Sequence, residues 1–329
     1  MSRPPTILLT NRIHPAVQDL FAGEARFIVA QAPEPDAIRA DAIDHQADAV
    51  IVRALLPDDL FDAAPALCAA VRHGAGIDMI PLQAAARCNV PVANVPGVNA
   101  RSVAEHVAMQ LIALARRNGP VRRDMARRDW WTARAHADSG VELLGRTVGL
   151  VGVGNVGQQV AAILHHGFGM RVIGTGPETD RWPPFVRPRD LEALLAESDA
   201  LVLCCPLTER TRGLIDAAAI ARMKPGAFLI NVARGPVVVE DALVDALRKG
   251  KLGGAALDVY ASHPLSSDHP FHDLPTLLLT PHIAGITDGS MRRMGEGAVT
   301  QALQILRGEK PPHLIDARVW DRRRRPSGR

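Results

Sequence analysis

Short runs of apolar, β-branched residues alternate with Ala-rich stretches in the first third of the chain. The apolar runs lie at 6–11, 25–30, 48–53, 68–74 and 90–95. Strands buried in a parallel sheet have this continuous apolar character, and the Ala-rich stretches between them suit crossover helices. The same rhythm restarts at 147–154, so the pattern predicts a second α/β unit.

Two longer stretches have the spacing of amphipathic helices. In 100–117, Ser102 and Glu105 have capping-box spacing, and the apolar stripe consists of Val103, Val107, Leu111, Ile112 and Leu114. The stretch 290–308 ends at Gly308, before two prolines. We expect this second helix to pack back onto the first unit.

These elements predict an α/β protein of two Rossmann-like domains, each with a doubly wound parallel sheet, and an active-site cleft between them. We expect a substrate-binding domain at 1–99 plus 287–329. The cofactor domain is expected at 100–286. A chain of 329 residues is long enough for each domain to bury its own core.

A glycine-rich motif gives the first chemical indication. In "VGLVGVGNVGQQVAAIL", Gly152, Gly154 and Gly157 form G-x-G-x-x-G directly after an expected strand and at the head of an expected helix. The first glycine permits a tight turn, the second lets the backbone approach a pyrophosphate, and the third allows close helix–strand packing. The motif predicts a dinucleotide site that includes Asn155 and Val156.

The next expected strand, 170–176, leaves the choice between NAD and NADP open. A site that grips the 2′-hydroxyl of NAD usually has a carboxylate at the end of this strand. Here the strand ends in Gly176, while Arg181 stands in reach of a 2′-phosphate. The sequence therefore predicts NAD or NADP as cofactor, with a slight lean towards acceptance of NADP.

Composition narrows the possible partners. The net charge is only +3, so we expect neither nucleic acid nor a membrane surface as a binding partner. We expect the basic tail from Asp321 to be a frayed, solvated end. We also expect no signal peptide, no spanning segment, no metal, and a cytoplasmic protein whose cysteines are reduced packing residues, Cys68, Cys88, Cys204 and Cys205.

Six further motifs appear in order along nearly the whole chain. They are "HGAGID" (73–78), "SVAEHV" (102–107), "CPLTERTRGLI" (205–215), "INVARGPVVVEDAL" (230–243), "GAALDV" (254–259) and "LTPHIAG" (279–285). Together with the glycine motif they resemble the D-isomer-specific 2-hydroxyacid dehydrogenase family, which includes glyoxylate/hydroxypyruvate reductases and 3-phosphoglycerate dehydrogenases. The resemblance implies hydride transfer between NAD(P)(H) and a small 2-oxo or 2-hydroxy acid.

The resemblance also implies the catalytic residues. It places the family's arginine at Arg234 and its histidine at His282. A guanidinium presents paired donors to a carboxylate and polarises the neighbouring carbonyl, and an imidazole gives or takes the alcohol proton near neutral pH. We therefore expect Arg234 to bind substrate and His282 to be the acid/base.

The segment "LDVYASHPLSSDHPF" departs from the family. The family's third catalytic residue, a Glu, is replaced by His263, which we predict to face His282. Should it not do so, Glu240 or Asp268 is the alternative partner. We expect His269 to be structural.

Weaker positions follow from the same resemblance. Substrate contacts are expected from Arg53, Ala75 and Gly76, with Arg53 equally readable as a surface residue. Ser102 either caps its helix or touches the cofactor. Further cofactor contacts are expected from Pro206, Thr211, Ala233, Asp258, His282 and Gly285. A homodimer built on 100–117 and Trp130–Trp131 is implied.

Two rival functions remain open at this stage. One is a catalytically idle dinucleotide sensor similar to the corepressors that share this fold, which the loss of the family Glu keeps alive. The other is a related dehydrogenase of another small anion, formate or phosphite. Retention of Arg234 and His282 favours the 2-hydroxyacid dehydrogenase over the sensor.

Overall fold

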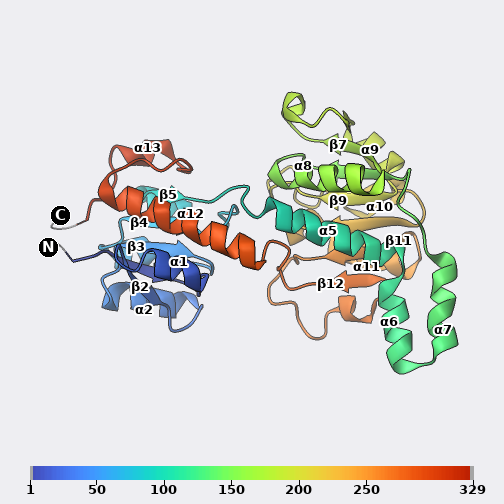
Figure 1. The fold of residues 1–329 in the computed structure, drawn as a ribbon, viewed down its shortest axis with the longest axis horizontal. Coiled ribbons are helices and arrows are strands. Elements are labelled where there is room, and N and C mark those ends of the chain that lie inside the picture. The colour runs from blue at the N-terminus through green and yellow to red at the C-terminus, as the bar shows by residue number, and fades with distance from the viewer. Residues whose placement is uncertain (1–2, 327–329) are drawn as a thin grey trace. The chain divides into compact units, whose positions relative to one another are not determined.

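The computed structural model describes residues 3–326 and divides the chain into two compact units (Figure 1). Unit 1 consists of Met1–Asn99 and Ile286–Arg329, and unit 2 is Ala100–Gly285. Each unit has its own parallel sheet. Among the described residues, no helix has the length and apolar character needed to cross a membrane.

Unit 1 has a five-stranded parallel sheet in the order β2-β1-β3-β4-β5, a doubly wound order. The five apolar runs of the sequence are confirmed as its strands, β1 (Thr6–Leu9), β2 (Arg26–Val29), β3 (Ala49–Val52), β4 (Ala69–Arg72) and β5 (Val92–Ala93). Its helices are α1 (Pro15–Leu20), α2 (Pro35–Asp44), α3 (Leu60–Ala63), α4 (Leu82–Arg87), α12 (Asp288–Arg307) and α13 (Ala317–Trp320).

The long helix α12 confirms the expected return of the chain to the first unit. Thr287 and Ser290 form a capping box at its start, and Gly308, with φ 84°, ends it in the left-handed conformation. It packs against β3 and β4 and buries Ala298 and Ala302 in the core of unit 1.

The basic tail is more ordered than the sequence predicted. Arg324 donates hydrogen bonds to the carbonyl oxygens of Phe61, Ala64 and Leu67, and the Arg323 guanidinium lies 4.0 Å from the Trp320 ring centroid. The expectation of a frayed, solvated end was therefore wrong for these arginines. The Arg324 guanidinium satisfies carbonyl oxygens at and just after the end of the short helix α3, and Arg323 is held by the face of an aromatic ring. Residues 327–329 lie outside the described residues.

Unit 2 has a seven-stranded parallel sheet in the order β12-β11-β10-β9-β6-β7-β8. Its strands are β6 (Thr147–Val151), β7 (Arg171–Thr175), β8 (Val186–Pro188), β9 (Ala200–Leu203), β10 (Ala227–Asn231), β11 (Leu252–Leu257) and β12 (Leu277–Leu279). Counted from β6, this is the 3-2-1-4-5-6 order of dinucleotide-binding folds with one more strand at the edge. The strand order reverses between β6 and β9, which is where such sheets bind ligands.

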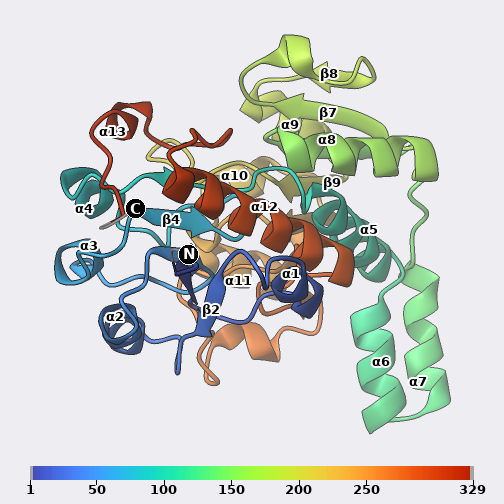
Figure 2. The same cartoon turned by 60° about the vertical axis from the view of Figure 1, so that its left-hand side comes forward.

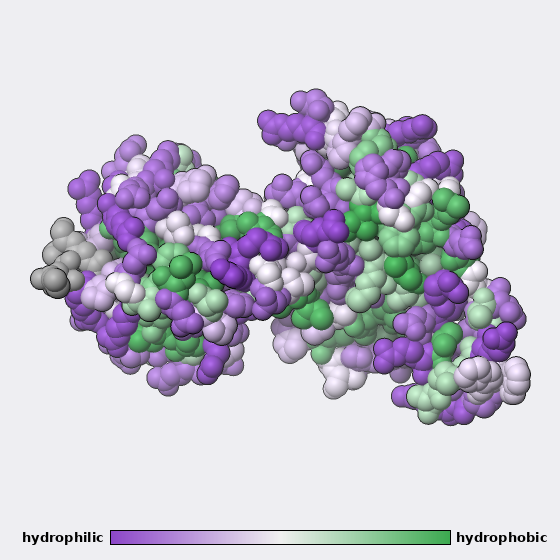
Figure 3. Space-filling view, in the orientation of Figure 1, coloured by the Kyte–Doolittle hydropathy of each residue, from purple (hydrophilic) through white to green (hydrophobic). Residues whose placement is uncertain are grey.

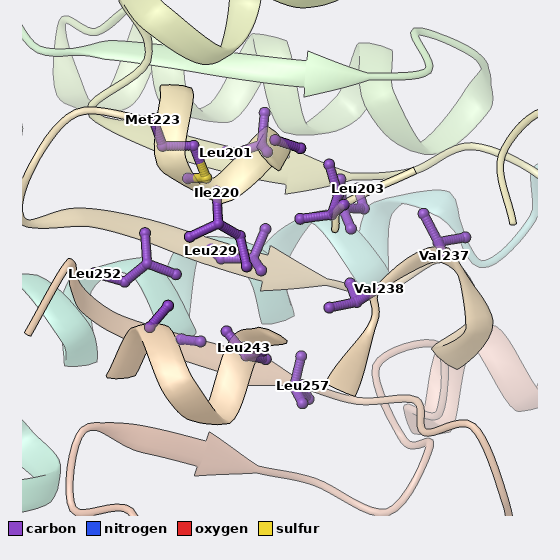
Figure 4. Close-up of a cluster of buried hydrophobic side chains, with 14 of the residues drawn as sticks. Leu201, Leu203, Ile220, Met223, Leu229, Val237, Val238, Leu243, Leu252 and Leu257 are labelled. Carbon is purple, nitrogen blue, oxygen red and sulfur yellow. The ribbon is translucent and has the colours of Figure 1, made fainter. Parts of the chain in front are cut away.

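The helices of unit 2 cover both faces of this sheet. They are α5 (Ala100–Ala115), α6 (Asn118–Arg127), α7 (Trp130–Ala135), α8 (Asn155–Ala162), α9 (Leu191–Glu197), α10 (Ala217–Arg222) and α11 (Glu240–Arg248). Figure 2 shows α6 and α7 side by side as a pair. The cluster in Figure 4 buries Leu201, Leu229 and Leu257 of three neighbouring strands against α10 and α11.

Helix α5 corrects two details of the sequence prediction. It begins at Ala100, so Ser102 lies inside its first turn, and Glu105 pairs instead with Arg101 (Nε–Oε1 2.7 Å). The predicted capping box was wrong, because an N-cap at Ser102 would start the helix at Val103, whereas the helix starts three residues earlier, at Ala100. In the expected apolar stripe, Ile112 is 39% exposed, whereas the other four members are buried.

Candidate functional site

The glycine-rich turn has the geometry that its spacing predicts. Gly152 has φ 92°, and a Cβ there would meet the backbone of Cys205 at 2.9 Å. A Cβ on Gly157 would lie 2.3 Å from the Gly152 carbonyl oxygen. By contrast, a Cβ on Gly154 would meet nothing within 4 Å, so there is open space at the N-terminus of α8. Backbone N–H groups at a helix start facing open space fit a pyrophosphate.

The loop after β9 lies on the other side of the strand-order reversal. The Thr211 hydroxyl donates to the Pro206 carbonyl oxygen (2.7 Å), and Thr208 N–H donates to Thr211 Oγ1 (2.8 Å). Thr211 therefore shapes the loop from within, because its hydroxyl both donates and accepts. Cofactor contacts by Pro206 and Thr211 stay predictions.

The end of β7 bears on the choice of cofactor. Gly176 has φ 150°, a backbone conformation that a side chain strains. The following turn carries Arg181, which pairs with Glu178 (Nη1–Oε2 3.0 Å), and Gln158 of α8 donates to the Arg181 carbonyl oxygen (3.4 Å). Arg181 thus sits on a turn tied to the helix that follows the glycine-rich motif.

The turn after β10 positions Arg234. The Asn231 side chain holds both ends of this turn, accepting from Ala233 N–H and donating to the Arg234 carbonyl oxygen, each at 3.0 Å. A Cβ at Gly235 would overlap the Tyr260 carbonyl carbon at 1.8 Å. Only glycine lets the backbone beside Arg234 press directly on the backbone that follows β11.

Asp258 organises the loop that carries His282. Its carboxylate is 2% exposed and accepts hydrogen bonds from Thr280 Oγ1 (2.6 Å), Ile283 N–H (2.9 Å) and Ala284 N–H (2.9 Å). Three donors satisfy a buried charge that would otherwise be costly. His282 has φ 56°, a conformation uncommon for residues other than glycine. The contact of Asp258 with a nicotinamide carboxamide stays a prediction.

Two residues behind this loop were not found by sequence reasoning. The Tyr260 hydroxyl donates to the carbonyl oxygens of Leu257 (3.1 Å) and Thr280 (2.8 Å), and burial raises its pKa to about 12. His106 of α5 lies with Nε2 3.3 Å from Thr280 Oγ1, and burial lowers its pKa although the Asp258 carboxylate acts in the opposite direction. The contacts of Tyr260 and His106 with Thr280 span 20 and 174 residues, so no local pattern signals them.

His263 lies beside His282. The two ring centroids are 5.6 Å apart, and the ring planes are tilted by 42°. Tyr260 N–H donates to His263 Nε2 at 3.4 Å. Glu240 has other partners: its carboxylate accepts from Ala261 N–H (2.8 Å) and lies 3.5 Å from His269 Nε2. Of the candidates for a neighbour of His282, the structure brings His263 next to it.

His269 holds the start of a short turn. Its Nδ1 accepts from Phe271 N–H at 3.3 Å, and its ring centroid lies 4.3 Å from that of Phe271. With Glu240 on its other nitrogen, the ring is fixed from two sides. The expectation of a structural role fits these contacts.

The weaker substrate candidates lie in unit 1. Arg53 donates to the Arg12 carbonyl oxygen, and burial lowers the pKa of its guanidinium. In the "HGAGID" loop, Asn94 Nδ2 donates to the Ala75 carbonyl oxygen (2.7 Å) and Arg72 Nε to that of Gly76 (2.9 Å). Arg53 is therefore tied to the backbone, and the loop is held from two sides.

A seven-stranded sheet of dinucleotide-binding order, an open glycine-rich turn at its switch point, and an arginine and a histidine on neighbouring loops define a dinucleotide-dependent oxidoreductase. The chain belongs to the D-isomer specific 2-hydroxyacid dehydrogenase family, whose NAD binding domain matches residues 108–284. It is an NAD(P)-dependent 2-hydroxyacid dehydrogenase.

Curated relatives carry related names. The glyoxylate reductase of Thermofilum pendens is 36% identical over 79% of this chain and 78% of its own length. That of Aeropyrum pernix is 32% identical over 96% of this chain and 97% of its own length. The D-3-phosphoglycerate dehydrogenase of Mycobacterium tuberculosis is 32% identical over 95% of this chain, which spans only 59% of that relative.

Solved structures show the same fold. The TT0316 protein from Thermus thermophilus is 32% identical, with a TM-score of 0.85 over 94% of this chain and all of its own. The NAD-dependent formate dehydrogenase from Staphylococcus aureus, in complex with NAD, is 28% identical (TM-score 0.82; 95% and 98% covered). The NADPH-dependent glyoxylate/hydroxypyruvate reductase from Sinorhizobium meliloti is 26% identical (TM-score 0.82; 94% and 97% covered). The cofactor is accordingly NAD or NADP.

Proposed function

We propose that the chain reduces a small 2-oxo acid of the glyoxylate or hydroxypyruvate type, and catalyses the reverse oxidation, with Arg234 and His282 as catalytic residues. One observation carries the proposal: a continuous chain of contacts within unit 2 joins the loop of Arg234 to the loop of His282. Gly235 presses on Tyr260, Tyr260 N–H donates to His263, and the His263 ring lies beside that of His282.

The proposed roles follow from the chemistry of the two side chains. NAD(P)H supplies the hydride when it is bound. The Arg234 guanidinium pairs with the substrate carboxylate and polarises the neighbouring carbonyl by stabilising the negative charge that develops on its oxygen. The His282 imidazolium gives a proton to that oxygen in reduction, and the neutral ring takes it back in oxidation.

His263 is proposed to position His282. Because Nε2 of His263 accepts the Tyr260 N–H, the neutral His263 ring carries its proton on Nδ1. That tautomer offers a donor to a neutral neighbouring ring.

The remaining site residues are proposals of the same kind. We propose that the cofactor meets the turn of Gly152, Gly154 and Gly157 with Asn155 and Val156. The open space at Gly154 supports this. Further cofactor contacts are proposed for Pro206, Thr211, Ala233, Asp258 and Gly285. Arg53, Ala75 and Gly76 of unit 1 are proposed to add contacts to the substrate carboxylate.

We also propose a homodimer. Large apolar side chains are exposed on α5, α6 and α7, namely Met109, Ile112, Met125, Trp130 and Trp131. Figure 3 shows apolar surface on the face of unit 2 that α5 crosses. Clustered apolar surface of this kind marks interaction sites. A cytoplasmic location is proposed as well, in keeping with four free cysteines.

A substrate panel tests the function. Glyoxylate, hydroxypyruvate and pyruvate are each incubated with NADH and with NADPH, and formate and phosphite with NAD and NADP, while nicotinamide absorbance is followed. We expect fast loss of absorbance with glyoxylate or hydroxypyruvate. Turnover of formate or phosphite alone would establish the other anion dehydrogenase. Cofactor binding without turnover of any compound would indicate the idle sensor.

A further inference from the structure

A pocket of about 530 Å³ lies at the amino-terminal end of β6, β7 and β8, within unit 2. The glycine-rich turn follows the carboxyl end of β6, and β6 runs from Thr147 to Val151. At roughly 3.3 Å per residue, about 13 Å of strand separates the pocket from that turn. The pocket is therefore distinct from the cofactor site.

The sheet register directs several arginines to one face. Arg187 of β8 pairs with Ile173 of β7, so both side chains point the same way, as do Arg171 and Arg189, each two residues away. A Cβ on Gly149, which pairs with Ile173, would point at Ser198 and Leu194. This face of the sheet is thus the one covered by α9, and the pocket lies beside that helix.

The charge of the pocket is strongly positive. Its lining has four cations, Arg171, Arg187, Arg189 and Lys224, and a single carboxylate, Glu197. Arg189 pairs with Glu197 (Nε–Oε1 2.8 Å), and Lys224 pairs with Asp199 (Nζ–Oδ1 2.9 Å).

Two of the pocket's arginines have no protein partner. Within the described range 3–326, the side chains of Arg171 and Arg187 make no hydrogen bond or ion pair. Like charges on neighbouring positions of one sheet face destabilise each other. A bound dianion would relieve this repulsion.

The other part of the lining is apolar. Phe185 stacks on His165, with ring centroids 4.3 Å apart and planes within 4° of parallel. Pro184 also lines the pocket, and Ile173 lines it from the face that carries the arginines. An apolar wall beside a few convergent charged groups is the usual composition of a small-molecule site of this volume.

We propose that this pocket binds an organic phosphate monoester, with its phosphate held by Arg171 and Arg187 and its apolar part against Phe185. Guanidinium groups bind phosphate through paired N–H···O contacts, and a dianion matches two unpaired cations better than a carboxylate does. The inference is independent of the reaction proposed for the cofactor site.

Calorimetric titration with phenyl phosphate tests the proposal. The full chain is first saturated with NADH or NADPH, whichever binds more tightly, so that the cofactor site is filled. We expect one phenyl phosphate per chain, with benzoate binding at least about tenfold more weakly. Arg171→Gln and Arg187→Gln should each lower the association constant about tenfold, because each removes one charge-assisted contact.

Arg248→Gln is the matched control, because Arg248 is an exposed arginine of the same unit on α11, outside the pocket. It should leave phenyl phosphate binding unchanged, and all three variants should keep the wild-type affinity for the dinucleotide. The proposal is overturned by absence of binding in the wild type, by benzoate binding as tightly as phenyl phosphate, or by equal losses in Arg248→Gln.

Discussion

Arg234 owes its proposed role to the shape of its side chain as well as to its charge. The turn at Asn231 and the close approach at Gly235 fix its backbone, so the guanidinium is presented from a rigid base. Arg234→Lys keeps the charge but loses the paired donors. We expect kcat/KM for the preferred 2-oxo acid to fall about 100-fold or more. Steady-state kinetics check this, and a near-wild-type value would remove Arg234 from the mechanism.

His263→Glu tests the pair of histidines. A carboxylate beside His282 stabilises its protonated ring, whereas a second imidazole does not. Reduction requires protonated His282, so the descending limb of the reductive pH–rate profile should move up by about one unit in the variant. His269→Gln, at a histidine already held by Glu240 and Phe271, is the control and should leave the limb in place.

If the limb stays in place in an active His263→Glu variant, His263 does not act on His282. The oxidative direction gives an independent reading. It requires the neutral ring, so the ascending limb of the oxidative profile should move in the same direction as the reductive limb.

His73 makes unit 1 sensitive to acid. It is 3% exposed, its Nε2 has no partner within residues 3–326, and burial with the charges of Arg53 and Arg72 lowers its pKa to about 3. At pH values between the pKa of His73 in the folded chain and its pKa of about 6.5 in the unfolded chain, the unfolded chain binds a proton that the folded chain does not. Stability contributed by the neutral ring is present above pH 6.5 or so and is lost as the pH falls.

The expected loss through His73 between pH 7 and pH 4.5 is on the order of 2 kcal/mol. Urea unfolding followed by circular dichroism at the two pH values measures it. His73→Gln should reduce the pH-dependent loss, whereas His45→Gln, at a half-buried histidine of α2's end, should not. An identical pH dependence in wild type and His73→Gln would contradict the assignment.

At the scale of elements, the turn that follows β7 is expected to select the cofactor. Gly176→Asp is a poor test, because φ 150° strains any side chain there. Arg181→Gln is a better test. The Arg181 guanidinium is exposed and pairs with the exposed Glu178, so its loss should leave the fold intact. We expect the ratio of kcat/KM with NADPH to that with NADH to fall about tenfold.

Arg222→Gln provides the control for Arg181. It removes an exposed arginine that pairs with a glutamate on another helix of unit 2. The cofactor ratio should be unchanged in this variant. If Arg181→Gln also leaves the ratio unchanged, the discrimination between NADH and NADPH lies in another element.

At the scale of the whole molecule, the proposed dimer depends on exposed apolar side chains. Trp131 is 74% exposed on α7, and Trp130 beside it is 60% exposed. Trp131→Glu places a charge in the proposed interface, and burying an unpaired charge costs several kcal/mol. Sedimentation should show a dimer for the wild type and a monomer for the variant. Ile43→Glu on α2, an exposed position elsewhere, should remain dimeric. A monomeric wild type would contradict the proposal.

Local patterns in the sequence were sufficient for most of the fold. Apolar runs marked the five strands of the unit 1 sheet, and β6 and β7 of the unit 2 sheet, because strands of a parallel sheet are buried on both faces. The spacing of Gly152, Gly154 and Gly157 predicted the turn before α8. A side chain at Gly152 or Gly157 would clash with nearby backbone, and Gly154 leaves open space at the start of the helix. Thr287, Ser290 and Gly308 bound α12 by local hydrogen bonds and a left-handed residue.

Only the tertiary structure decided how distant residues meet. Two separate parts of the chain converge on the loop of His282, namely α5 with His106 and the segment after β11 with Asp258 and Tyr260. Glu240 lies beside His269 rather than beside His282. The cations of the phosphate pocket come together because the register of β7 and β8 aligns them on one face. A sequence states which groups are present within a turn or a strand, whereas contacts across a sheet depend on strand order and register, which form only when the whole unit folds.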